Sequence, residues 1–147
     1  MTNKEKNDYF YLCSLIEYIA RKTKNKRRVI VNALGKDGIK KQLKDAQVNH
    51  CLSFEQVSDE IIEYYKIEDG DFDTIANCKY SIPSYVDIGQ LYMFMIRNLA
   101  KNGDDLETLI SVFNSFISDE ISNFKTGVYF ENLDYLQESY KAGYLLD

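Results

Sequence analysis

The sequence predicts an all-α protein, a single compact bundle of about six or seven helices with an irregular loop near residues 68–83. Three observations predict this class. Apolar residues recur three and four positions apart along most of the chain. Only one proline and seven glycines interrupt the 147 residues, which favours long regular elements over a turn-dense β-sandwich. The length is typical of one domain, so we expect residues 1–147 to form a single helical domain.

Four helices are predicted before the loop. They span residues 7–23, 26–34, 37–46 and 53–65. Asn7 is a suitable N-cap for the first helix, and Gly35 can adopt the left-handed conformation that ends the second. Ser53 and Gln56 form a capping box, because each side chain can bond the other's backbone amide. Residues 48–52 are expected to be a connector.

Three further helices are predicted after the loop. They span residues 84–101, 104–124 and 132–141. Ser84 and Asp87 give a second capping signal, and Gly103 separates the first two of these helices. The segment from Tyr92 to Ile96 is apolar almost all round. We therefore expect the helix over residues 84–101 to be the most buried and central one.

Charge is distributed unevenly along the chain. Residues 1–50 carry 12 lysines and arginines against 5 acidic residues, whereas residues 51–147 carry 6 against 18. Most of the positive charge lies in two short predicted helices that meet at Gly35 and loosely resemble a helix-turn-helix. We call this set the basic patch; its members are Arg21, Lys24, Lys26, Arg27, Arg28, Lys36, Lys40, Lys41 and Lys44.

Three interpretations of the basic patch are open. It can be a solvated surface or face the acidic half of the same chain, it can contact an acidic protein partner, or it can contact nucleic-acid phosphates through counterion release. The overall pI near 5.0 argues against a general DNA-binding domain. Nearer the amino terminus, Glu17 and Arg21 lie four residues apart and are expected to form an exposed ion pair.

Catalytic signatures are lacking, and we expect no enzyme, no cofactor, no catalytic residue and no metal site. His50 is the only histidine and precedes Cys51, but adjacent residues on a regular element point in different directions, which argues against a dyad. Residues 69–73 carry alternating aspartates like a calcium loop. Thr74 and Tyr80 stand where an EF-hand needs glycine and glutamate, so a structural loop is favoured.

The predicted cellular localisation depends on motifs that the sequence lacks. The three cysteines are odd in number and form no C-x-x-C motif, which agrees with reduced thiols. No apolar run of 18 residues indicates a membrane span, and the amino terminus has no signal-peptide pattern. We expect a cytoplasmic protein that does not bind membranes.

Several segments are similar to known sequences. They are Tyr9-Phe-Tyr-Leu-Cys-Ser-Leu-Ile-Glu-Tyr-Ile-Ala-Arg21, Ala33-Leu-Gly35, Ala46-Gln-Val-Asn-His50, Ile82-Pro-Ser84 and Asp87-Ile-Gly-Gln-Leu-Tyr92. Over residues 7–100 the chain resembles uncharacterised small helical proteins of Gram-positive bacteria and their mobile elements. Some of those proteins are found beside genes for toxin-like ADP-ribosyltransferases. The resemblance implies an accessory or antitoxin-like binding role.

Our leading prediction is therefore a non-enzymatic protein-interaction module whose partner is another bacterial protein. The bipolar charge and the 12 tyrosines, a residue type enriched at binding hot spots, favour it. The alternative is a small nucleic-acid-binding regulator that uses residues 21–46. The sequence does not determine the oligomeric state.

Overall fold

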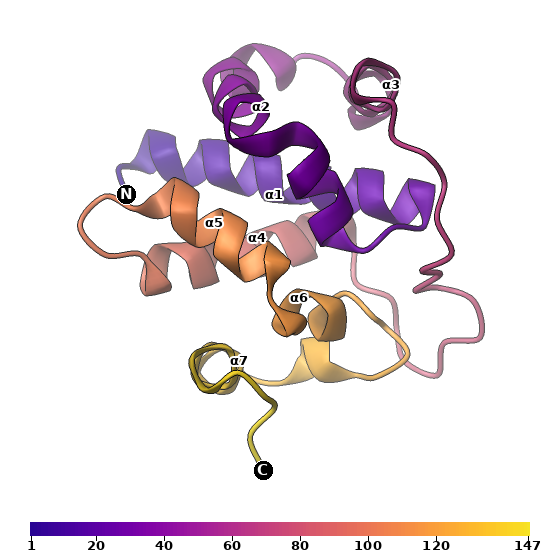
Figure 1. The fold of residues 1–147 in the computed structure, drawn as a ribbon, viewed down its shortest axis with the longest axis vertical. Helices are drawn as coiled ribbons and strands as arrows, with labels where there is room; N and C mark the ends of the chain where they lie inside the picture. Colours follow the sequence, from indigo (N-terminus) through magenta and orange to yellow (C-terminus); the bar gives the residue numbers. More distant parts are fainter.

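The computed structural model describes residues 1–147 and is all-helical, with no strand, which confirms the predicted class. Figure 1 shows the helices gathered into one compact bundle. The elements are α1 Asn3–Thr23, α2 Arg27–Asn49, α3 Phe54–Tyr65, α4 Tyr85–Leu99, α5 Asp105–Asn114, α6 Phe116–Ile121, the 3-10 helix η1 Val128–Phe130, and α7 Leu133–Ala142.

Helix α1 occupies the centre of the bundle. It packs against α2, α3 and α4, and it runs beside α4 across the middle of Figure 1. The prediction that residues 84–101 form the most central helix is thus wrong, because α1 buries residues on nearly all sides. The close approach of α1 to α4 requires Gly89, where a Cβ atom would lie 2.7 Å from the backbone nitrogen of Ser14. Asn7 is not the N-cap of α1; Thr2 is, in a capping box with Glu5.

The predicted break at Gly35 is confirmed. Gly35 has a φ of 67° and interrupts α2 with a kink, so that the two predicted helices meet there. The second part of α2, residues 36–49, extends beyond the predicted end at residue 46. Residues 48 and 49, predicted as connector, are therefore helical. In Figure 1 the second part of α2 and α3 lie together above α1.

The helix predicted over residues 104–124 is wrong in one respect, because it is broken at Ser115 into α5 and α6. Three side chains bond backbone carbonyls around the break: Asn114 Nδ2 to Ile110 at 2.9 Å, Ser115 Oγ to Val112 at 2.7 Å, and Ser118 Oγ to Phe113 at 2.7 Å. Polar side chains that bond nearby carbonyls in this way compete with the helical ladder.

One of the two bonds of the capping box predicted at Ser53 and Gln56 is present, and so is the cap predicted at Ser84. Ser53 Oγ and Ser84 Oγ accept hydrogen bonds from the backbone amides of Gln56 and Asp87, at 3.1 and 3.0 Å. The segment between α3 and α4 is irregular, as expected. Its middle is fastened to the α1–α2 junction, because the backbone amides of Gly70 and Phe72 donate to the carbonyls of Thr23 and Lys24, each at 2.8 Å. No helix is long and apolar enough to span a membrane.

Candidate functional site

Six of the nine side chains of the basic patch pair with carboxylates of the same chain. Arg21 and Arg27 pair with Glu17, Lys26 and Arg28 with Asp119, Lys36 with Glu107, and Lys41 with Asp45. Four of these six pairs join the basic patch to α5, α6 or the buried carboxylate of α1 rather than to a neighbour one turn away. The three remaining lysines, Lys24, Lys40 and Lys44, are exposed and make no ion pair. Most of the basic patch is thus paired with carboxylates of the same chain, although Arg27 alone of the nine residues is buried.

Arg27 requires a correction, because it was predicted as a surface contact and is completely buried. Its Nε donates to Glu17 Oε1 at 2.8 Å, its second terminal nitrogen donates to Glu17 Oε2, and its Nη1 donates to the carbonyl of Asn25 at 3.1 Å. A buried guanidinium needs such partners because desolvation of an isolated charge is costly. Arg27 therefore belongs to the core and not to an interface.

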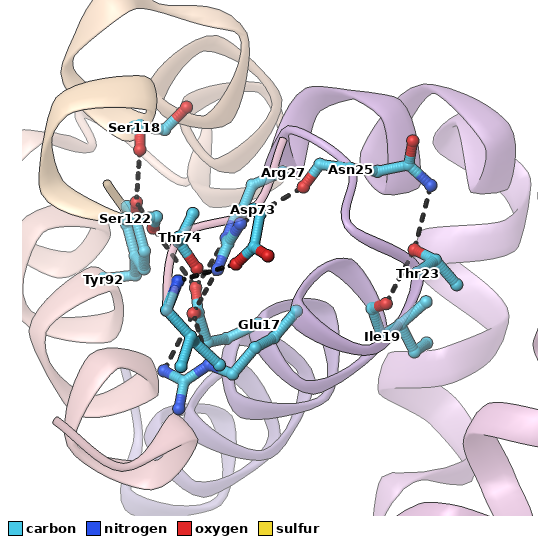
Figure 2. A network of polar contacts seen from close by, with 12 residues as sticks. Glu17, Ile19, Thr23, Asn25, Arg27, Asp73, Thr74, Tyr92, Ser118 and Ser122 are labelled. Atoms are coloured by element: carbon cyan, nitrogen blue, oxygen red, sulfur yellow. Dashed lines mark hydrogen bonds and ion pairs between the residues drawn. The ribbon is translucent and has the colours of Figure 1, made fainter. Parts of the chain in front are cut away.

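Glu17 is the centre of this buried network, as Figure 2 shows. Arg21 donates to Oε2 through Nε and Nη2 at 3.2 and 3.0 Å, and Ser122 Oγ donates to Oε1 at 3.2 Å. Burial opposes the charge of Arg27, but attraction by Glu17 and hydrogen bonding outweigh it and raise the Arg27 pKa. Burial, assisted by Glu17, also raises the pKa of Tyr92, whose hydroxyl lies 2.7 Å from Ser122 Oγ.

The predicted ion pair between Glu17 and Arg21 is present, but it is not exposed, since Glu17 has no solvent-accessible surface. One signal in the sequence indicated this burial. Glu17 follows Cys13 by four residues and precedes Ala20 by three, so it lies on the apolar stripe of its helix. The partner residues Arg27 and Ser122 are distant in sequence and carried no comparable signal.

His50 and the aspartate loop at residues 69–73 each make contacts within the fold. His50 ends α2, and its ring lies 4.5 Å from that of Tyr11. In the loop, Asp73 Oδ1 accepts hydrogen bonds from the backbone amides of Ile75 and Ala76 at 3.0 and 3.1 Å. These bonds lower the pKa of Asp73. No group of three histidine, cysteine, aspartate or glutamate side chains is placed to share a metal ion.

A groove that sequence reasoning missed lies between the second part of α2 and α3. We call it the α2–α3 groove; its volume is about 270 Å³, and its lining residues are Lys41, Gln42, Asp45, Asn49, Val57, Glu60, Ile61, Tyr64 and Tyr65. Val57 and Ile61 are buried, whereas Tyr64 at the rim is 79% exposed. The α3 wall is thus apolar below and aromatic above.

Gln42 distinguishes this groove from the other hollows of the surface. The residue is 8% exposed, and its buried Oε1 atom has no hydrogen-bond partner in the chain. Buried acceptors without a partner cost about 1–3 kcal/mol and are therefore rare in folded proteins. Gln42 follows Ile39 by three residues and precedes Ala46 by four, so a polar residue stands on the apolar stripe of α2.

Two further buried atoms lack a partner, Arg28 Nε and Asp119 Oδ1. They belong to one ion pair, in which Arg28 Nη2 donates to Asp119 Oδ2 at 2.6 Å. A slight rotation of either side chain would give the paired, two-bond geometry that arginine and carboxylate favour. These two atoms therefore have a local explanation.

Comparison with protein families, with curated proteins and with solved structures finds no match for the chain. The resemblance to helical proteins of Gram-positive bacteria therefore stays a prediction.

Proposed function

We propose that the chain is a non-enzymatic protein-interaction module and that the α2–α3 groove is its contact surface. The observation that carries the proposal is the groove itself, in which the exposed side chain of Tyr64 lies beside the buried side chains of Val57 and Ile61.

The composition of the groove supports the same proposal. Interfaces are built around apolar anchors and aromatic residues, with tyrosine enriched among the residues that contribute most binding energy. Tyr64 presents its ring to solvent above the apolar floor of Val57 and Ile61. An exposed tyrosine costs little conformational entropy on binding, since it has only two side-chain torsions.

Nucleic-acid binding has weaker support. Of the basic patch, only Lys24, Lys40 and Lys44 make no ion pair, and each phosphate contact by a paired side chain would first have to break that pair. An antitoxin-like or accessory role remains one form that a protein-interaction module could take, and it would be supported by recovery of a toxin as the partner.

The test is affinity purification of the tagged protein from its own host at low and moderate salt, with proteins and nucleic acids both identified. Tyr64→Ala is compared with Tyr144→Ala, a matched variant at a 63% exposed tyrosine that follows α7. In Figure 1, α7 lies at the opposite end of the molecule from α3. We expect one stoichiometric protein to be retained by the wild type and by Tyr144→Ala but lost from Tyr64→Ala.

Two results would contradict the proposal. Equal recovery of every protein by both tyrosine variants would show that the groove is not the contact surface. Recovery of nucleic acid alone, abolished by Lys40→Glu with Lys44→Glu, would favour the regulator instead.

A further inference from the structure

We propose that residues 68–74, which we call the acidic strap, form an autoinhibitory cover over the α1–α2 junction, residues 21–28. The strap opens without unfolding of the helices, and the junction then binds an acidic segment of a protein partner in its place. The inference concerns residues outside the α2–α3 groove and does not depend on that groove. It follows from the charges, the contacts and the hydrogen bonds of the strap.

The acidic strap and the α1–α2 junction carry opposite charges. The strap has four carboxylates and no cation, whereas the junction has six cations and no carboxylate. Five of these cations pair with Glu17, Asp59 or Asp119, so three carboxylates serve the whole junction. The sixth, Lys24, makes no ion pair, but after the backbone amides of residues 76 and 75 its charge helps to lower the pKa of Asp73. The strap is therefore attracted to the junction without direct ion pairs, and salt weakens such an attraction.

Few contacts hold the acidic strap in place. Two of its backbone amides donate to carbonyls of the junction, and Asn25 Nδ2 donates to the carbonyl of Glu68 at 2.9 Å. Of the strap's own residues, only Thr74 is buried. A segment with so few buried side chains and bonds opens locally at a lower free energy than the whole fold.

The half-buried ring of Phe72 lies beside the buried ion pair of Arg27 and Glu17. Its centroid is 6.0 Å from the guanidinium carbon of Arg27 and 5.9 Å from the ammonium of Lys26, within the range of a cation–π contact. A buried ion pair has lost much of its hydration. When the strap opens, water reaches this side of the pair, and the regained hydration offsets part of the contacts that are lost.

The hydrogen bonds of the strap indicate which ligand replaces it. The carbonyls of Thr23 and Lys24 accept from the amides of Gly70 and Phe72, two residues apart, each at 2.8 Å. An extended peptide supplies N–H donors at this spacing, as in strand addition, whereas a phosphodiester backbone has no N–H group. The junction is therefore suited to an acidic peptide with one aromatic residue, which the strap itself resembles.

Hydrogen exchange of the ¹⁵N-labelled full-length protein tests whether the strap opens by itself. After correction for intrinsic rates, the amides of Gly70 and Phe72 should exchange together and at least roughly tenfold faster than that of Ile16 in the core. An increase from about 20 to about 500 mM NaCl should speed both roughly threefold and leave Ile16 unchanged. The double variant Asp69→Asn with Asp71→Asn, at exposed positions, should speed both at low salt and remove most of the salt dependence.

Peptide binding tests what the open junction accepts. The probe is the blocked peptide Glu-Asp-Gly-Asp-Phe-Asp-Thr, and the matched control has Gln or Asn in place of its four acids. In Gly70→Ala, the new Cβ atom would lie 2.3 Å from Asn25 Oδ1 and 2.7 Å from the carbonyl oxygen of Lys24, so the strap cannot close while the junction keeps every side chain.

The acidic probe should bind Gly70→Ala at least roughly tenfold more tightly than the wild type, in which the attached strap competes at a high effective concentration. The uncharged control should bind neither protein. If circular dichroism shows that Gly70→Ala is not folded, the double variant of Asp69 and Asp71 takes its place, with a gain of roughly threefold expected.

Three results would overturn the inference. Exchange of Gly70 and Phe72 only at the rate of Ile16 would show that the strap opens only when the fold does. Equal binding of the acidic probe to the wild type and the opened variant, or no binding to either, would show that the strap covers no site for an acidic segment. Tighter binding of an oligonucleotide of eight thymidines than of the probe would assign the junction to nucleic acid. None of these results bears on the α2–α3 groove, which the tyrosine variants test separately.

Discussion

Two buried polar groups of this chain differ in the hydrogen bonds that they receive. Around Glu17, a carboxylate with no exposed surface receives hydrogen bonds from Arg21, Arg27 and Ser122. In the α2–α3 groove, Gln42 Oε1 receives none from the chain, although a neutral amide is far easier to satisfy than a charge. The fold therefore provides three hydrogen-bond donors for the Glu17 carboxylate and none for the Gln42 amide oxygen.

The difference separates the contacts that hold the fold together from the groove that we propose as the contact surface for a partner. The Glu17 network joins α1, the start of α2 and the end of α6, so its bonds fix elements distant in sequence relative to one another. The groove lies at the boundary of α2 and α3 and is open on one side. Substitutions in the network should lower stability, whereas substitutions in the groove should change binding and need not lower stability.

The largest expected effect is at Glu17. Glu17→Leu leaves the buried Arg27 guanidinium without its counter-charge, which typically costs about 3–5 kcal/mol in the free energy of unfolding. Urea unfolding followed by circular dichroism measures the loss.

The matched double variant Glu17→Leu with Arg27→Met tests the reason for that loss. Replacement of both members of a buried ion pair by apolar residues is often nearly neutral, so the double variant should recover most of the stability. A loss below about 1 kcal/mol for Glu17→Leu alone would mean that Arg27 finds other compensation, and the network would not be the structural centre described above.

A smaller effect is expected at Asp119, which pairs with Arg28 and Lys26 near the surface. Arg28 remains partly exposed and can be rehydrated when its partner is lost. Asp119→Ala should therefore cost about 1 kcal/mol, and less at high salt. A cost equal to that of Glu17→Leu would show that burial does not separate the two ion pairs.

A substitution in the α2–α3 groove should raise the stability of the fold, in contrast to those at Glu17 and Asp119. Gln42→Met removes a buried acceptor without a partner and keeps an unbranched chain of similar length, so it should raise stability by about 1 kcal/mol. Gln47→Met, at an exposed position of the same helix, is the control and should change stability little. If Gln42→Met were destabilising, Gln42 would be part of the fold's own bonding and the contrast between the two regions would fail.

The features that could be predicted from sequence are those decided within one turn of helix. The serine caps at Ser53 and Ser84 and the kink at Gly35 depend on residues no more than four positions apart, and all three are present. The break at Ser115 was missed, although its side-chain bonds are equally local, because serine and asparagine also occur inside unbroken helices.

The candidate site could not be predicted because it depends on contacts between distant segments. Glu17 meets Arg27 across 10 positions and Ser122 across 105, so composition assigned Arg27 to a surface patch, whereas the fold buries it. The α2–α3 groove likewise depends on contacts between residues distant in sequence. Polar residues on apolar stripes, Glu17 and Gln42, were the only sequence signal, and that signal does not say which of them receives a partner.

The smallest effect concerns a carboxylate that belongs to neither region. The backbone amides of Ala76 and Ile75 hold the pKa of Asp73 below its ordinary value of 3.8. The charged form is favoured in the folded state, so its contribution to stability is fully present above pH 3.8 and is lost as the pH falls through the lower, folded-state pKa.

Asp73→Asn keeps an acceptor oxygen without the charge. The stability difference between wild type and this variant, from urea midpoints, should therefore be constant from pH 7 to about pH 5 and shrink at about pH 3. Asp71→Asn, two residues earlier in the loop, controls for the loss of one negative charge. A difference for Asp73→Asn that is the same at both ends of this range would mean that the turn does not depend on the ionised carboxylate, and the loop would be held by its bonds to Thr23 and Lys24 alone.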